Sequence, residues 1–278
     1  MKVVGVDIGG TSITAGLVED QGIISTTVSD TLSHRAKNEI LDDLFQVLSK
    51  IITPDTRAIG IGVPGVVDTD KGVIHEIINI PAWKNFPLKE KVETEFGLPV
   101  LIENDANCFA LAIHHFGTGK NYRDIVGISI GTGLGAGIII NGKLYSGVKS
   151  GAGEFGQLPY KAGIFEDYCS GKFFLAGNNL SGADAYQKAC RGEKEALDTW
   201  FEFGTHIGKL LQLVIYALAP ELIILGGSVS KGFDFFRPSM LKVLDGCYLQ
   251  GIIRNTRIEA DLNSLNPLLG AAALCYVE

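Results

Sequence analysis

Hydrophobic and polar residues alternate near the start of the chain in the way that is typical of adjacent β-strands. Residues 2–8 and 12–19 are strand-like and are joined by a Gly9-Gly10-Thr11 turn, and residues 22–28 continue the pattern. The spacing then changes, because apolar residues recur every three or four positions over residues 36–52, which predicts an amphipathic helix. The chain therefore opens as a meander of strands followed by a helix.

Further along, short apolar runs of the kind found in buried strands alternate with segments of helical spacing. The predicted strands are 58–63, 99–103 and 221–225, and the predicted helices are 106–116, 197–218 and 267–276. The strand 99–103 ends at Asn104-Asp105, and the strand 221–225 ends at Gly226-Gly227. Strands that alternate with helices are typical of the α/β class.

One pattern occurs twice. Residues 126–140 (VGISIGTGLGAGIII) echo residues 4–18 (VGVDIGGTSITAGLV), with Ser129 at the position that Asp7 holds in the first copy. Each copy reads as strand, glycine turn, strand, which indicates duplicated α/β units. We therefore expect two lobes, the first formed by residues 1–117 with a C-terminal helix at 265–278 and the second by residues 118–264.

Composition and charge narrow the class of ligand. The 278 residues are 46% hydrophobic and 20% charged, which is ordinary for a globular protein. The 24 Lys and Arg against 31 Asp and Glu give a net charge of −7, without a basic run. This charge offers no attraction for nucleic acid or for an anionic membrane. A small-molecule ligand is therefore expected.

The five cysteines lie far apart and include no CxxC pair, which favours a reducing compartment and offers no zinc-ligand spacing. The apolar stretch at 210–220 is too short to span a membrane, and the N-terminal apolar run is interrupted by Asp7. We therefore predict a cytoplasmic protein without a membrane partner.

The glycine turns are candidate phosphate sites. In the first, Gly9 and Gly10 would let backbone N–H groups approach an anion, Thr11 would add a hydroxyl, and Asp7 could hold Mg²⁺ through water. Taken alone, this segment is as well explained by a tight hairpin. The second turn, Gly131-Thr132-Gly133, favours the phosphate site over a purely structural hairpin, because two such hairpins could hold one triphosphate between them.

Three carboxylates are candidates for binding or deprotonating a hydroxyl group of a substrate. Asp105, at a strand-to-helix junction, is either a general base for a hydroxyl group or an N-cap of the helix. Glu154 and Glu166 lie in turn-rich sequence, where they either bind sugar hydroxyls or are solvated loop acids.

Together these motifs resemble the ROK family of sugar kinases and repressors, within the actin-like ATPase superfamily. Segments 7–11 and 131–137 resemble the two phosphate motifs, and 225–227 resembles the adenosine motif. Segments 62–65 and 79–83 resemble sugar-side loops, and 103–107 (ENDAN) the catalytic segment. The resemblance covers nearly the whole chain. It implies a two-lobed actin-like ATPase fold, that is, a duplicated ribonuclease H-like fold whose lobes close on the sugar.

The resemblance also implies residue roles. Asp105 would be the catalytic base. The residues that would bind the sugar are Gly65, Asn79, Asn104, Asp105, Glu154, Gln157 and Glu166. The residues that would contact ATP are Asp7, Gly9, Gly10, Thr11, Gly131, Thr132, Gly133, Gly226 and Gly227, with Mg²⁺ near Asp7. Family members are often dimers, so a homodimer is one expected assembly, with the helix 197–218 as its interface or simply as core.

The sequence departs from the family pattern at one loop. Many members have Glu-x-Gly-His followed by a cysteine-rich zinc loop, whereas here the histidine position is Gln157 and residues 158–165 contain no cysteine. Cys169 alone cannot form a tetrahedral zinc site, so no zinc is predicted. Of the roles that the resemblance implies, the assignment of Glu166 as a sugar ligand depends most on how this loop is aligned with the family.

These observations predict ATP-dependent phosphorylation of a hexose such as glucose, mannose, fructose, N-acetylmannosamine or N-acetylglucosamine. One alternative is a sugar-binding regulator without kinase activity. We expect no N-terminal DNA-binding domain, since the first phosphate hairpin begins within ten residues of Met1. The other alternative is a kinase that uses polyphosphate, against which the Gly226-Gly227 motif favours ATP.

Overall fold

A computed structural model describes the chain except for residues 21, 78, 179 and 277–278. Its contacts divide the chain into two compact units. Unit 1 comprises residues 1–121, 137–152 and 265–278, and unit 2 comprises residues 122–136 and 153–264. The predicted lobes differ from these units mainly at 137–152. This segment groups with unit 1 because a Cβ atom at Gly137 would lie 2.5 Å from the carbonyl oxygen of Ala106, so the backbone there lies directly against a unit 1 helix.

Unit 1 is built on a five-stranded sheet with the order β3-β2-β1-β4-β7. The strands are β1 (Lys2–Ile8), β2 (Ser12–Glu19), β3 (Gly22–Asp30), β4 (Thr56–Val63) and β7 (Val100–Asn104). The first three form the predicted antiparallel meander, whereas β1, β4 and β7 run parallel. The carboxyl ends of these three strands therefore meet at one edge of the sheet.

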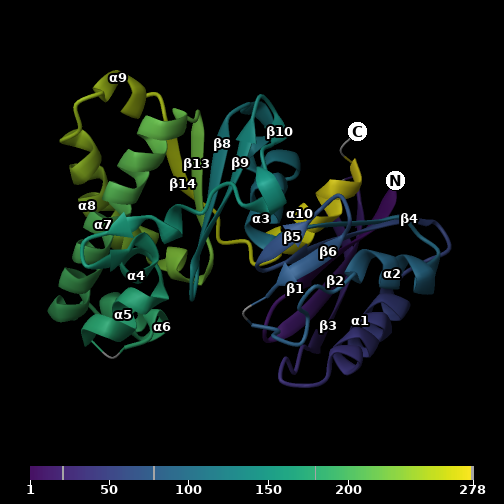
Figure 1. Cartoon of the computed structure of the whole chain (residues 1–278). Helices are drawn as coiled ribbons and strands as arrows, with labels where there is room; N and C mark the ends of the chain where they lie inside the picture. Colours follow the sequence, from purple (N-terminus) through teal and green to yellow (C-terminus); the bar gives the residue numbers. More distant parts are fainter. Residues whose placement is uncertain (21, 78, 179, 277–278) are drawn as a thin grey trace. The chain divides into compact units, whose positions relative to one another are not determined.

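Helices cover this sheet. They are α1 (Lys37–Ile51), α2 (Leu88–Phe96), α3 (Asp105–His115) and α10 (Asn266–Ala273), accompanied by the small strands β5 (Val66–Asp68) and β6 (Val73–Glu76) and by the 3-10 turns η1 (Thr118–Asn121), η2 (Val148–Ser150) and η5 (Leu274–Tyr276). Helix α10 packs on α3, β1 and β4. The packing is close, because a Cβ atom at Gly270 would lie 1.6 Å from the carbonyl oxygen of Cys108. Gly5 of β1 likewise lies directly against the Leu268 carbonyl oxygen of α10, which places the start of the chain beside its end (Figure 1). The Tyr276 hydroxyl also donates to the Met1 carbonyl oxygen at 2.9 Å.

The second sheet has the order β10-β9-β8-β13-β14, which repeats the arrangement of the first. Its strands are β8 (Ile125–Ile130), β9 (Leu134–Ile140), β10 (Lys143–Leu144), β13 (Leu222–Gly226) and β14 (Arg257–Ala260). Strand β13 runs parallel to both β8 and β14. The repeat seen in the sequence is thus confirmed, because each copy forms the hairpin that opens one sheet.

Of this sheet, β10 and residues 137–140 of β9 belong to unit 1, and the part of unit 2 outside the other strands is mostly helical. It contains α4 (Phe165–Cys169), α5 (Gly171–Asn178), α6 (Gly182–Cys190), α7 (Lys194–Leu218), α8 (Phe233–Asp245) and α9 (Gln250–Ile253), with the two-residue strands β11 (Pro159–Tyr160) and β12 (Gly163–Ile164) and the turns η3 (Phe155–Gln157) and η4 (Ser228–Gly232). Helices α7 and α8 lie side by side (Figure 1). The predicted helix 197–218 is confirmed, and its buried face forms the core around Trp200 and Phe203.

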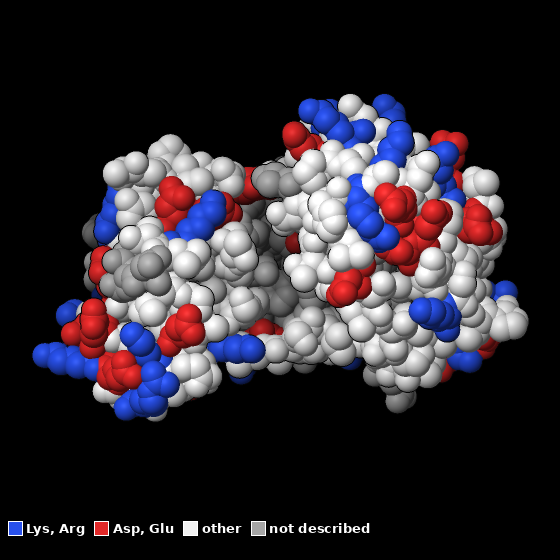
Figure 2. Space-filling model, turned by 90° about the horizontal axis from the view of Figure 1, so that it is seen from below, with Lys and Arg blue, Asp and Glu red and all other residues white. Residues whose placement is uncertain are grey.

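The distribution of charged side chains on the surface agrees with the absence of a basic run in the sequence. On the face shown in Figure 2, basic and acidic side chains are interspersed over the described residues, without an extended basic area. Within the described part of the chain, no helix combines the length and the apolar character that crossing a bilayer requires.

Candidate functional site

Polar side chains gather at the edge of the unit 1 sheet where its parallel strands end. Asp7 lies next to the end of β1 and pairs in register with Gly62 of β4, which in turn pairs with Glu103 of β7. Asn104 ends β7 and Asp105 begins α3. The ends of these strands thus place two aspartates at the same edge of the sheet, near enough for the charge of Asp105 to act on Asp7.

Asn104 is the residue that caps α3. Its side-chain oxygen accepts hydrogen bonds from the backbone N–H groups of Ala106 (2.9 Å) and Asn107 (3.3 Å), and its amide donates to the Gly65 carbonyl oxygen at 3.1 Å. Asp105 is therefore the first helical residue and not the cap, although one of its oxygens also accepts from the Ala106 N–H at 2.9 Å. Because Asn104 satisfies the helix end, capping does not explain an aspartate at position 105.

Both aspartates are half-buried, and their electrostatics differ from those of surface acids. Burial, and secondarily the charge of Asp105, raises the pKa of Asp7 to about 7. Burial also raises the pKa of Asp105, against the opposing effect of the hydrogen bond from Ala106. A carboxylate with a raised pKa is a better proton acceptor than a solvated one, which suits general base chemistry.

The first glycine hairpin lies at the same end of unit 1. The Thr31 hydroxyl donates to the Gly9 carbonyl oxygen at 2.6 Å and so fixes the turn. A Cβ atom at Gly10 would lie 2.6 Å from the Cβ atom of Asn79, so Asn79 lies directly against this turn. Unit 1 therefore brings the predicted sugar-side residue Asn79 into contact with the predicted phosphate residue Gly10.

Unit 2 carries the second hairpin, between β8 and β9. The Gly131 N–H donates to the Gly133 carbonyl oxygen at 3.0 Å, and the Gly171 N–H donates to the Gly131 carbonyl oxygen at 2.8 Å. Gly227, with φ of 85°, lies so close that a Cβ atom would approach the Ile130 carbonyl oxygen to 2.4 Å. The predicted phosphate turn and the predicted adenosine motif are thus neighbours.

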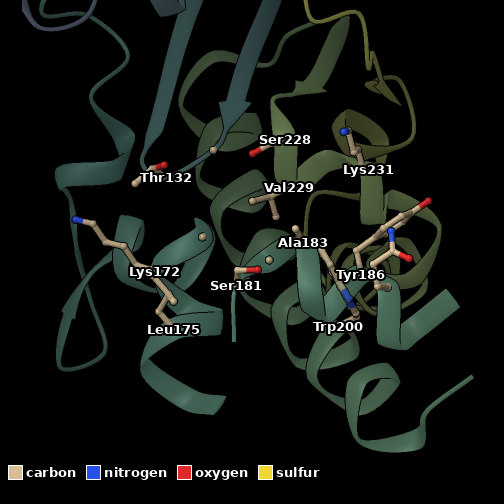
Figure 3. A pocket seen from close by; sticks show the side chains of 14 residues that line it. Thr132, Lys172, Leu175, Ser181, Ala183, Tyr186, Trp200, Ser228, Val229 and Lys231 are labelled. Carbon is tan, nitrogen blue, oxygen red and sulfur yellow. The ribbon is translucent and has the colours of Figure 1, made fainter. Parts of the chain in front are cut away.

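A cavity of about 400 Å³ opens beside this hairpin, all within unit 2 (Figure 3). Glycine and small polar residues line it near the turn, whereas apolar and aromatic residues line the remainder. The residues that line it are Gly131, Thr132, Gly171, Lys172, Leu175, Ser181, Gly182, Ala183, Tyr186, Gln187, Trp200, Ser228, Val229 and Lys231. An apolar pocket with a polar, glycine-rich end fits a nucleoside followed by phosphates.

The remaining predicted sugar ligands also belong to unit 2. Glu154 and Gln157 are exposed and lie directly before and at the end of η3, whose Gly156 would place a Cβ atom 2.9 Å from the Leu134 carbonyl oxygen. Glu166 lies in α4, where its carboxylate accepts from the Leu134 N–H at 2.9 Å and from the Lys172 amine at 2.6 Å. Unit 2 therefore brings Glu166 to the base of the second hairpin.

Sequence reasoning missed several residues of the cavity, of which Lys172 and Trp200 have the clearest chemistry. Lys172 follows the Ser170-Gly171 pair that opens α5, and a glycine before a lysine near a helix start was an available signal for an anion site. Trp200 had no such signal, because its position in α7 reads as core. It lies at the cavity with its indole N–H buried and without a partner among the described residues.

The residues differ in how well they fit the predicted Mg²⁺ and the zinc that many ROK family members are expected to bind. Asp7 and Asp105 offer two half-buried carboxylates beside a glycine turn, which suits Mg²⁺ bound together with phosphate oxygens. For zinc, the described residues contain no group of three or more His, Cys, Asp or Glu side chains placed to hold an ion. The hairpin that follows Gln157 is instead held by aromatic contacts, since Tyr160 stacks on Phe165 at 4.3 Å and its hydroxyl lies 3.0 Å from Nδ1 of His206.

Comparison with known proteins agrees with this geometry. The model of the ROK family matches residues 3–277. A β-glucoside kinase of Listeria monocytogenes is 40% identical, over 98% of this chain and 96% of that protein. A glucokinase of Streptomyces coelicolor is 31% identical, over 98% and 96% of the two chains. The crystal structure of a ROK family glucokinase from Streptomyces griseus, solved with glucose and AMPPNP, superposes with a TM-score of 0.83 at 30% identity and covers 99% of both chains.

The duplicated sheets and the glycine hairpins thus define a sugar kinase with the actin-like ATPase fold, as predicted. Within that class, the chain belongs to the ROK family.

Proposed function

We propose that the protein transfers the terminal phosphoryl group of ATP to a hydroxyl group of a hexose. The nucleotide binds in the unit 2 cavity, and Asp105 of unit 1 accepts the proton of the attacking hydroxyl. The observation that carries this proposal is the raised pKa of Asp105 at a helix start that Asn104 already caps. Phosphoryl transfer requires positioning and charge stabilisation more than strong basicity, which a carboxylate of this kind provides.

The remaining roles follow from position. Asn104, Gly65 and Asn79 of unit 1, with Glu154, Gln157 and Glu166 of unit 2, bind the sugar hydroxyls. Backbone N–H groups of the two glycine hairpins bind phosphate oxygens, and Gly226-Gly227 lets the nucleoside approach the backbone. Asp7 would hold Mg²⁺ through water, and the bound metal would neutralise phosphate charge.

The test is an assay of sugar phosphate formation over glucose, mannose, fructose, N-acetylglucosamine and N-acetylmannosamine, with ATP or polyphosphate as donor, in which coupled ADP release follows the reactions with ATP. We expect turnover with ATP, and an Asp105→Asn variant that loses about 10²- to 10⁴-fold in kcat while it still binds sugar. Asp42→Asn, an exposed position on α1, is the matched control and should keep full activity. Near-normal turnover of the Asp105→Asn variant would reject Asp105 as the base. No sugar phosphate from any sugar with either donor would favour a regulatory role.

A second acceptor class is the glucosyl unit of a β-glucoside. The observation that supports it is the 40% identity to a β-glucoside kinase. Adding cellobiose to the panel separates the two classes. A kcat/KM for cellobiose at least tenfold above that for glucose would establish β-glucosides as the preferred acceptors, and the reverse order would exclude that preference.

A further inference from the structure

Two lysines, Lys172 and Lys231, are the charged side chains among the described residues that line the unit 2 cavity, and that lining contains no carboxylate. They lie on different sides of the cavity, and Lys172 shares its side with Thr132 of the glycine hairpin (Figure 3). A cavity with a lysine beside a glycine turn has the chemistry of a phosphate site, since the lysine ammonium is a compact point charge that binds phosphate well.

Lys172 does not face the cavity unpaired. Its amine lies 2.6 Å from Oε1 of Glu166, whose other oxygen accepts from the Leu134 N–H. The lysine side chain is 46% exposed, and an ion pair that water reaches to this extent contributes little to stability. Stability therefore does not explain why a lysine stands here.

The two partners have competing uses. Glu166 is a predicted sugar ligand, and each of its oxygens already accepts one hydrogen bond within unit 2, with Lys172 as the donor to Oε1. A phosphate group at the hairpin would offer Lys172 a second anion within reach of its flexible stem. When the lysine moves to that phosphate, Oε1 becomes available to accept from a hydroxyl group.

We propose that Lys172 binds a phosphate group of the nucleotide and thereby releases the Glu166 carboxylate for the sugar. The inference rests on the proposed binding of a nucleotide in the unit 2 cavity, but it does not require turnover. It makes Lys172 a binding residue for the nucleotide and a coupling element between the two substrates. Because coupling between two ligands is reciprocal, the sugar must strengthen nucleotide binding by the same factor.

The first test is isothermal titration calorimetry of the full chain with AMPPNP and with adenosine. Lys172→Met should raise the Kd for AMPPNP about 10- to 100-fold and change the Kd for adenosine less than about twofold, because adenosine has no phosphate. Lys172→Arg should keep most of the affinity for AMPPNP. The matched control is Lys242→Met, an exposed lysine of α8, which should bind both ligands like the wild type.

The second test measures coupling. In the wild type, saturating AMPPNP should lower the Kd for glucose, or for the best acceptor of the panel. In the Lys172→Met variant, the Kd for that sugar should already be low and should not respond to AMPPNP. The single change leaves the Glu166 carboxylate without its cation. A double variant, Lys172→Met with Glu166→Gln, removes that charge, and it is used for the AMPPNP titration if the single variant folds poorly.

The inference is overturned if Lys172→Met, or the double variant in its place, binds AMPPNP like the wild type, or if it weakens AMPPNP and adenosine equally. It is also overturned if the AMPPNP effect on the sugar Kd is the same in the wild type and the variant. Failure of the proposed function is a different result: AMPPNP would bind with the expected dependence on Lys172, but no sugar would release ADP.

Discussion

At the scale of single residues, Asp7 carries a measurable consequence of its surroundings. Its pKa of about 7 lies above the ordinary value of 3.8 because burial and the nearby Asp105 charge disfavour ionisation in the folded state. The folded protein then binds more protons than the unfolded chain between about pH 4 and pH 7. Its stability must therefore fall as the pH rises through that window, and the loss is complete above pH 7.

We expect Asp7→Asn to abolish this pH dependence. Since one pKa unit corresponds to about 1.4 kcal/mol, the variant should be more stable than the wild type at pH 8 by at most about 4 kcal/mol, with no difference below about pH 4. Denaturant unfolding at several pH values measures the free energy of unfolding of each protein, and Asp42→Asn on the exposed face of α1 is the control. Equal slopes in the wild type and Asp7→Asn would show that Asp7 ionises normally in the folded state.

At the scale of elements, the hairpin β11–β12 positions α4 and its Glu166. Tyr160 of this hairpin stacks on Phe165 at 4.3 Å, lies edge-on to Tyr168 at 5.3 Å and shares a hydrogen bond with His206 of α7. Aromatic pairs of this geometry add about 0.5–1.5 kcal/mol each beyond burial. The side chain thus connects the loop to the core of unit 2.

Tyr160→Ala removes two aromatic pairs and a hydrogen bond and should therefore destabilise the protein by about 2–4 kcal/mol. It should raise the KM for sugar more than it lowers kcat, because Glu166 is displaced while Asp105 is not. Tyr160→Phe keeps the stacking and should cost only about 1–2 kcal/mol for the lost hydrogen bond. Tyr248→Ala, at a position 93% exposed, is the control. An unchanged KM for the alanine variant would mean that the hairpin does not position the sugar ligand.

Prediction from sequence succeeded where the information was local. The strands beside Gly9-Gly10 and Gly131-Thr132 and the helix at 36–52 follow from patterns of two or about four residues, and the structure contains them as β1–β2, β8–β9 and α1. What could not be predicted depends on contacts between segments far apart in the chain. The ion pair of Lys172 with Glu166, the hydrogen bond of Tyr160 with His206 and the place of Trp200 at a cavity all depend on how α4, α5 and α7 pack.

At the scale of the whole molecule, each unit has its own core, and each core contains one of the two tryptophans. Trp83 is fully buried in unit 1, where its indole N–H donates to the Lys37 carbonyl oxygen at 3.1 Å, and Trp200 is fully buried in unit 2. Single-tryptophan variants therefore report on one unit at a time: Trp83→Phe leaves Trp200, and Trp200→Phe leaves Trp83.

If the nucleotide binds to unit 2, AMPPNP must stabilise the unfolding transition that Trp200 reports more than the one that Trp83 reports. At a ligand concentration of 100 times Kd, linkage gives about 2.7 kcal/mol for the unit that binds the ligand. Thermal unfolding of the Trp83→Phe variant, followed by fluorescence with AMPPNP or with adenosine, measures the shift for unit 2. The Trp200→Phe variant supplies the unit 1 comparison. Because Trp200 lines the cavity, the Kd of this variant sets its ligand concentration. Equal shifts for both tryptophans would mean that the two units unfold as one cooperative body, whereas a larger shift for Trp83 would place the nucleotide on unit 1 and contradict the assignment of the cavity.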